Sequence, residues 1–263
     1  MNDKLLFFIV VLFFSSCMPE ENLPIRDVGE APEYFIECYC KAGAIFSLSA
    51  TTVLPVSKDL KVDFSKKMDV TIFAGKDIEL LHSLYTLPGS DFIYNYGSKE
   101  CFDSAGLDSL SLFIMTADGK RISSSTFIPS PVSIHDCRLE NKEVCVSFYT
   151  SELPEENYYI YVVEAMSRDI IVSQEVCYLD DSDVSSSRLI EKRLILPNIQ
   201  QADQVVVNLK RITKANYEYQ ISLSVANSAN QSSITTPVPL KGNLSGALGI
   251  FTCYTEDRRS IEL

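Results

Sequence analysis

The chain has 263 residues and a formal net charge of −12 at pH 7. Its lysines and arginines are too sparse to neutralise a phosphate backbone, so the composition argues against a nucleic-acid-binding protein. Tyr and Phe are abundant but Trp is absent. Because sugar-binding clefts often use an indole face, this absence weakens the case for a carbohydrate-binding site.

The N-terminus has the pattern of a bacterial lipoprotein signal. Lys4 precedes the unbroken apolar run Leu5–Phe14, and two serines supply small residues before Cys17. The run is too short to span a bilayer, which takes about 20 residues as a helix. We therefore predict that residues 1–16 are removed and that the Cys17 sulfur carries the acyl chains that anchor the protein to a membrane.

The segment that follows is polar and contains several prolines, so residues 17–32 are predicted to form an extended, lipidated tether. Glu20 and Glu21 lie a few positions after the cysteine. An acidic pair at this place resembles the export tag of surface lipoproteins in the Bacteroidetes, which would place the protein on the cell exterior. The alternative is that the two glutamates only begin the tether.

Short segments of alternating apolar and polar residues follow and predict β-strands. In the first half these are Tyr34–Cys40, Ala44–Leu54, Met68–Ala74, Ile78–Tyr85, Phe92–Gly97 and Leu110–Thr116. Asp118-Gly119 predicts a hairpin turn, because glycine accepts the positive φ of a tight turn. We expect residues 33–130 to form a β-sandwich domain.

Pro129-Ser130-Pro131 marks an internal boundary, because prolines interrupt both strands and helices. Beyond it, strands are predicted at Ser133–Arg138, Val144–Tyr149, Tyr158–Met166, Ile170–Leu179, Leu189–Leu196 and Gln204–Leu209. Residues 131–263 are therefore predicted to form a second β domain.

One segment of this second half fits two patterns. Between residues 214 and 230, Tyr219, Leu223 and Ala226 share one face of a helix, and Thr213 is placed to cap its start. Alternating apolar residues in the same segment also fit a strand. The residues alone leave this choice open.

Seven cysteines follow Cys17, and an odd number leaves at least one thiol unpaired or bridged between chains. Cys137 and Cys145 flank a stretch that could turn at Asn141, so we predict a disulfide between them. Cys38 and Cys40 lie two positions apart on a predicted strand. Their thiols fit core packing better than the alternative of a metal site.

The motifs of common enzyme classes are absent from the sequence. Neither His82 nor His135 stands near a second metal ligand at metal-binding spacing, which disfavours zinc and Ser-His-Asp chemistry. The acidic run that begins at Asp180 lacks the glycine and glutamate of a calcium loop. We predict no enzymatic activity, metal or cofactor, although a carboxylate pair for glycoside hydrolysis stays open as an alternative because the fold alone brings such pairs together.

Several segments carry a resemblance to a known family. In the second half they are Glu156–Tyr161, Lys210–Thr213 with Tyr217-Glu218-Tyr219, Thr236–Leu240 and Asn243–Phe251, and in the first half Phe35–Cys38 and Arg121–Pro129. Their order and spacing resemble the Bacteroidetes lipoproteins grouped as the domain of unknown function 4249 family, over almost the whole mature chain. The many cysteines and the stretch Ser182–Leu189 depart from that pattern.

The resemblance implies an Ig-like or transthyretin-like N-terminal sandwich and a second β domain with one helix near residues 214–230. It also implies that Gly246 and Gly249 are structural, because small residues let a closing strand pass close to its neighbours.

Members of this family are commonly encoded beside TonB-dependent transporters. The resemblance therefore implies a surface-exposed outer-membrane lipoprotein that assists such a transporter in nutrient capture or uptake. Its ligand is not identified by the sequence. A structural or adhesive cell-surface protein is the alternative.

Overall fold

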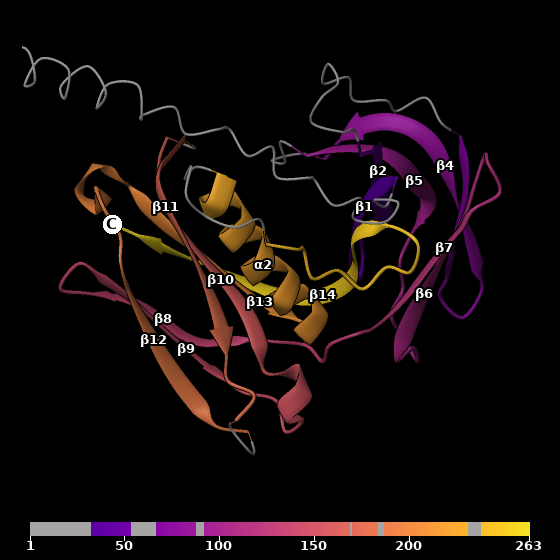
Figure 1. Ribbon diagram of the computed structural model, residues 1–263. Helices are drawn as coiled ribbons and strands as arrows, with labels where there is room; N and C mark the ends of the chain where they lie inside the picture. The colour runs from indigo at the N-terminus through magenta and orange to yellow at the C-terminus, as the bar shows by residue number, and fades with distance from the viewer. Residues whose placement is uncertain (1–32, 54–66, 88–91, 169, 184–186, 231–237) are drawn as a thin grey trace, which may run out of the picture. The chain divides into compact units, whose positions relative to one another are not determined.

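Strands make up most of the computed structural model, which describes residues 33–53, 67–87, 92–168, 170–183, 187–230 and 238–263. A single α-helix accompanies them in these residues (Figure 1). The predicted all-β fold class with one helix is confirmed.

All the strands except β7 and β14 follow segments predicted from alternation, and β14 is the longest described strand. They are β1 (Tyr34–Lys41), β2 (Ile45–Thr52), β3 (Met68–Phe73), β4 (Asp77–Thr86), β5 (Ile93–Cys101), β6 (Ser109–Thr116), β7 (Arg121–Phe127), β8 (Ile134–Glu140), β9 (Glu143–Tyr149), β10 (Tyr158–Ser167), β11 (Ile170–Asp180), β12 (Leu189–Ile195), β13 (Gln204–Ile212) and β14 (Leu248–Glu262). The helix is α2 (Lys214–Asn230), and a short 3-10 helix, η1, covers Pro154–Glu156.

Eleven strands form one sheet in the order β11-β10-β13-β14-β1-β2-β5-β4-β3-β6-β7, and β12, β9 and β8 form a second sheet. At the centre of the long sheet, β1 and β14 pair in parallel, with Ile36 opposite Gly249 and Lys41 opposite Tyr254. The other named strand pairs in the described residues are antiparallel. The first described strand of the chain is thus held by the last.

Two hydrophobic clusters fill the structure. The first is built from strands β1 to β7 together with Phe251 and Cys253 of β14. The second lies between the β10 and β13 part of the long sheet and the three-stranded sheet, where Tyr159 and Val207 pack with Phe148 (Figure 1). The boundary predicted at residues 130 and 131 falls between these two sets of strands, but β14 contributes to both clusters.

A buried arginine holds the segment that crosses this boundary. Arg211 of β13 is only 4% exposed. Its Nη1 donates to the carbonyl oxygen of Ser130 at 3.2 Å, to the Ser130 hydroxyl at 2.6 Å and to the carbonyl oxygen of Pro131 at 2.8 Å. Its Nη2 donates to the carbonyl oxygen of Tyr149 at 3.2 Å. The Ser130 hydroxyl donates in turn to buried Glu156, so a neutral side chain links a cation and an anion.

The segment 214–230 is helical, as the resemblance implies. Thr213 caps the helix, because its hydroxyl accepts a hydrogen bond from the Asn216 backbone N–H at 3.1 Å. The buried side chain of Tyr219 faces the long sheet and bonds to Glu37 of β1 at 2.8 Å. The helix therefore covers part of one face of that sheet (Figure 1).

Gly249 of β14 lies opposite Ile36 of β1. Its φ is +112°, and a Cβ built on it would stand 1.9 Å from the carbonyl oxygen of Ile36. At Gly246, with φ +90°, a Cβ would stand 2.8 Å from the carbonyl oxygen of Arg121. Both glycines are thus structural, as the resemblance implies.

We predict that Gly249→Ala lowers the free energy of unfolding by roughly 3 to 5 kcal/mol, because steric overlap adds to the strain of a positive φ. Gly119→Ala is the matched control, since Gly119 has φ +82° but nothing within 4 Å of an added Cβ. The control should cost only about 1 to 2 kcal/mol. Urea denaturation of the two full-length variants measures both, and equal losses would show that close approach is not the reason for glycine at position 249.

The turn between β8 and β9 corrects the predicted disulfide. Asn141 and Lys142 both have positive φ, and this two-residue turn pairs Glu140 with Glu143. Cys137 therefore lies opposite Val146, while Cys145 lies opposite Arg138. Because adjacent positions of a strand face opposite sides, the two thiols point away from each other. Both are free, and no bridge joins them in this register.

Three other thiols gather inside the first cluster. Cys38, Cys40 and Cys253 are buried there, and the Sγ atoms of Cys38 and Cys40 are 3.7 Å apart. Cys40 lies directly opposite Cys253 in the pairing of β1 with β14. The three cysteines pack as small apolar side chains.

We predict that iodoacetamide at pH 8 labels exposed Cys101 in the native protein and labels Cys38, Cys40 and Cys253 only after unfolding. Burial raises the pKa of Cys253 to about 12, so little reactive thiolate forms at that pH. Mass spectrometry of the labelled peptides measures this. Cys137 and Cys145 should also label after unfolding without reductant, and a peptide pair joined through them would contradict the observed register.

Candidate functional site

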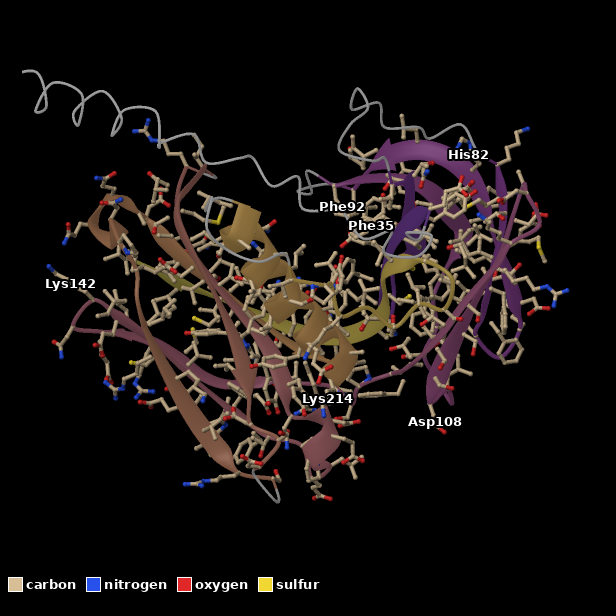
Figure 2. The ribbon with its side chains drawn as sticks, in the orientation of Figure 1. Phe35, His82, Phe92, Asp108, Lys142 and Lys214 are labelled. Atoms are coloured by element: carbon tan, nitrogen blue, oxygen red, sulfur yellow. The ribbon has the colours of Figure 1, made fainter. Side chains whose placement is uncertain are left out.

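A pocket of about 520 Å³ opens on the face of the long sheet that α2 partly covers. This volume lies within the range of small-molecule binding sites. Its described lining is Tyr39 of β1, Leu87, Phe92, Tyr94 of β5, Ile160 of β10, Lys210 and Ile212 of β13, Asn216 and Gln220 of α2 and Tyr254 of β14. Figure 2 labels Phe92, just before β5, and Lys214 at the start of α2.

Strand register brings the floor of this pocket together. Ile160 lies opposite Lys210, and Ile212 lies opposite Tyr254. Directly opposite residues share one face of a sheet, so these four side chains form a single surface. Tyr39 joins it from β1, where it alternates with core cysteines. The same strands therefore supply the core on one face and the pocket on the other.

Lys210 is the one lining residue in the described chain that is charged at neutral pH. Its side chain is 29% exposed, and its Nζ lies 5.0 Å from the centre of the Tyr254 ring. The nearest carboxylate is Glu256, whose Oε2 lies 4.0 Å from that Nζ. Burial lowers the pKa of Lys210, and the charge of Glu256 opposes this change.

Glu256 is shared between two lysines. It forms an ion pair with Lys41 as well as with Lys210, and it accepts a hydrogen bond from Asn208 at 3.5 Å. Burial raises the pKa of Glu256, but the hydrogen bond from Lys41 and the two lysine charges outweigh it, so its pKa is lower than usual. One carboxylate thus balances two cations beside the pocket.

Polar groups of α2 and β14 also face the pocket. Asn216 is 2% exposed, and its Oδ1 accepts a hydrogen bond from Gln220 at 3.3 Å. The Asn216 amino group and the Tyr254 hydroxyl can both donate hydrogen bonds. Together with the Lys210 ammonium, they make the polar side of the pocket rich in donors.

The buried carboxyl group of Glu37 lies next to Tyr39, which lines the pocket. Oε1 of Glu37 accepts hydrogen bonds from the hydroxyls of Tyr219 at 2.8 Å and Tyr39 at 3.1 Å. Burial raises the pKa of Glu37, and the two tyrosine hydrogen bonds only partly offset it. This group ties α2 to β1 and thereby fixes one side of the pocket.

The raised pKa of Glu37 gives stability a pH dependence of definite sign. Above pH 4.5, its ordinary pKa, the folded chain keeps a proton that the unfolded chain has lost. Stability therefore falls as the pH rises from this value through the folded pKa. We predict that Glu37→Gln, which keeps the acceptor oxygen and cannot ionise, flattens this part of the stability profile and does not weaken the fold at pH 7.

Chemical denaturation at a series of pH values measures the profile. Tyr219→Phe is the companion variant, because it removes a donor and keeps the ionisable group. It should lower the free energy of unfolding by about 1 to 3 kcal/mol. An unchanged slope in Glu37→Gln would contradict the assignment of the pH dependence to Glu37.

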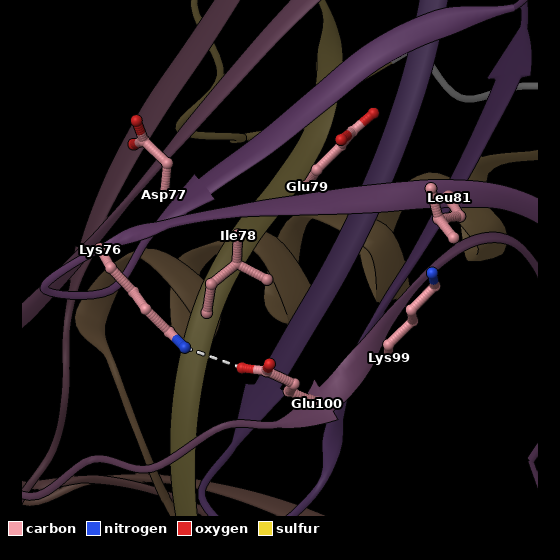
Figure 3. A pocket seen from close by; sticks show the side chains of 7 residues that line it. All are labelled: Lys76, Asp77, Ile78, Glu79, Leu81, Lys99 and Glu100. Carbon is pink, nitrogen blue, oxygen red and sulfur yellow. Dashed lines mark hydrogen bonds and ion pairs between the residues drawn. The ribbon is translucent and has the colours of Figure 1, made fainter.

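A second, smaller pocket of about 250 Å³ lies beside the turn between β3 and β4 (Figure 3). Lys76 and Glu100 form an ion pair across it at 2.8 Å, and their side chains are 67% and 68% exposed. Solvent screens such a pair, and the two charges already neutralise each other. This smaller pocket is therefore a weaker candidate for a ligand-binding site than the larger one.

The residues singled out from the sequence lie elsewhere. Cys17, Glu20 and Glu21 are outside the described residues, and Cys137 and Cys145 belong to the three-stranded sheet. Within the described part of the chain, no helix is long and apolar enough to cross a bilayer. The same residues contain no group of three or more His, Cys, Asp or Glu side chains arranged to hold a metal ion.

The two histidines lie outside the lining of the larger pocket. His82 packs its ring 5.2 Å from that of Tyr96, and His135 packs 5.4 Å from Tyr149. The pocket itself was not predicted. Two segments quoted for the family resemblance contribute to it: Glu156–Tyr161 supplies Ile160, and Lys210–Thr213 supplies Lys210 and Ile212.

Comparison with known proteins gives one match. The family model for a domain of unknown function, DUF4249, matches residues 26–260. Every residue that lines the larger pocket falls within this range. The comparison with curated proteins found no match.

Proposed function

The chain belongs to the domain of unknown function 4249 family, and from the pocket beside α2 we propose that it is a non-enzymatic capture protein. In this proposal it is a surface-exposed outer-membrane lipoprotein, anchored through Cys17, that binds a small ligand and assists a TonB-dependent transporter in its uptake. The observation that carries the binding role is the pocket, which draws its lining from β10, β13, β14, β1 and β5 of the long sheet and from α2.

The chemistry of the lining supports binding over catalysis. Most of the described lining residues are aromatic or aliphatic, and the polar ones are Lys210, Asn216 and Gln220. The described lining residues include no carboxylate, cysteine, serine or histidine to serve as a nucleophile or as an acid and base pair. An apolar cavity with a few convergent polar groups is typical of ligand-binding sites.

The membrane anchor rests on the sequence pattern at Cys17, and the transporter rests on the family resemblance. An adhesive role is the second candidate, supported by a specific surface. On the outer face of β3 and β6, the large apolar side chains of Phe73, Phe113 and Met115 are exposed. Exposed apolar side chains grouped in this way suit contact with another macromolecule.

We predict that Cys17→Ser abolishes acylation and releases the protein from the membrane fraction. The acyl chains attach only to that sulfur, and the Leu5–Phe14 run is too short to replace them as an anchor. Metabolic labelling with a tagged fatty acid and fractionation of the cells measure this. Cys101→Ser is the control, since it removes another exposed thiol and should leave labelling unchanged. Acyl labelling that persists in Cys17→Ser would refute the lipoprotein assignment.

We predict that a transporter of the TonB-dependent class co-purifies when mild detergent extracts the tagged protein from its own cells. Contacts with a partner protein are commonly made by surface loops. The association should therefore survive conservative substitutions inside the two hydrophobic clusters. Mass spectrometry of the eluate identifies the partner. Recovery of the protein alone, together with adhesion of intact cells that depends on Phe73 and Phe113, would favour the adhesive role instead.

A further inference from the structure

The larger pocket has one charged end. Lys210 carries a positive charge in a chain whose net charge is −12. The protein as a whole therefore repels anions, while this pocket presents a cation to whatever enters. Partial burial strengthens the interaction of this cation with a ligand charge, because fewer water molecules screen it.

The cation is available to a ligand. Its contact with Glu256, at 4.0 Å, is long for a hydrogen bond, and Glu256 is already engaged by Lys41. An ammonium group has three donors. The Asn216 amino group and the Tyr254 hydroxyl also line the pocket and can donate, so the pocket favours a group that accepts several hydrogen bonds, such as a carboxylate.

Apart from Gln220 and the Tyr39 hydroxyl, the rest of the described lining is apolar. Leu87, Ile160 and Ile212 supply aliphatic surface, and Phe92 and Tyr94 supply aromatic surface with their ring centres 5.3 Å apart. Such walls suit a hydrocarbon or aromatic body, because burying its surface is favourable and flat rings stack on flat rings.

From these observations we infer that the pocket binds a small anionic amphiphile, with a carboxylate-like group at Lys210 and an apolar body against Phe92 and Tyr94. This inference rests on the proposed capture function and names the ligand class of that pocket.

The test uses two probes of the same shape, 2-naphthoate and the uncharged 2-naphthamide. Each is titrated calorimetrically into the full-length mature lipoprotein in lipid nanodiscs, with empty nanodiscs as the blank. The wild-type protein should bind naphthoate about tenfold more tightly than naphthamide. Lys210→Met should weaken naphthoate binding by about tenfold and change naphthamide binding by less than about twofold.

Lys214→Met is the matched control, because Lys214 is an exposed lysine at the start of α2 and does not line the pocket. It should leave both affinities unchanged. Equal wild-type affinities for the two probes, or equal losses in the two lysine variants, would overturn the inference. If Lys210→Met does not fold, Tyr254→Phe replaces it, and an unchanged preference for naphthoate in that variant would count against the inference.

The two proposals fail in different ways. Recovery of the transporter with a protein that binds neither probe would overturn the ligand class and leave the partnership standing. Selective naphthoate binding by a protein that is always recovered alone would support the ligand class and overturn the partnership.

Discussion

The Arg211 guanidinium fixes the position of the segment that connects the two hydrophobic clusters. The segment around Ser130 crosses between them outside any strand, so its backbone carbonyls need donors from elsewhere. Arg211 supplies them to Ser130, Pro131 and Tyr149 through a planar group whose donors are spread like a fork. A buried cation is costly unless it is compensated, and Glu156 provides the opposite charge through the Ser130 hydroxyl.

The same strand, β13, also supplies Lys210, the charged residue of the candidate site. Arg211 and Lys210 are neighbours on β13, so their side chains leave opposite faces of the sheet. Arg211 points toward the segment at Ser130 and the second cluster, while Lys210 points into the pocket. The contacts that fix Arg211 therefore also fix where Lys210 stands relative to Tyr254, whose strand pairs with β13.

Local features of the fold could be predicted from the sequence because local physics decides them. Alternation predicted β1 to β6 and β8 to β13, and Asp118-Gly119 predicted the hairpin turn between β6 and β7. Thr213 fitted a helix start, but the choice between helix and strand for α2 came from the family resemblance. The disulfide prediction failed by one residue. The turn at Asn141 was expected, but its length was not, and a single step in register moves a thiol to the other face of the sheet.

The pocket could not be predicted, because it depends on pairing between distant parts of the chain. Tyr39, Tyr94, Lys210 and Asn216 are unremarkable at their own positions in the sequence. They meet only because β14 lies between β13 and β1, an arrangement that no local pattern specifies. Lys210 looked like one of several scattered cations until its neighbours on the sheet were known.

The parallel pairing of β1 with β14 also constrains the order of folding. The first cluster needs Phe251 and Cys253, which lie far from β1 in the sequence. Contacts of such long sequence separation form slowly, because closing the loop costs entropy before any pairing is gained. β1 can pair with β2 early, but its pairing with β14 and the completion of the first cluster wait until Phe251 and Cys253 have been made. In the export that we propose for this chain, that delay keeps the first cluster incomplete while the chain crosses a membrane.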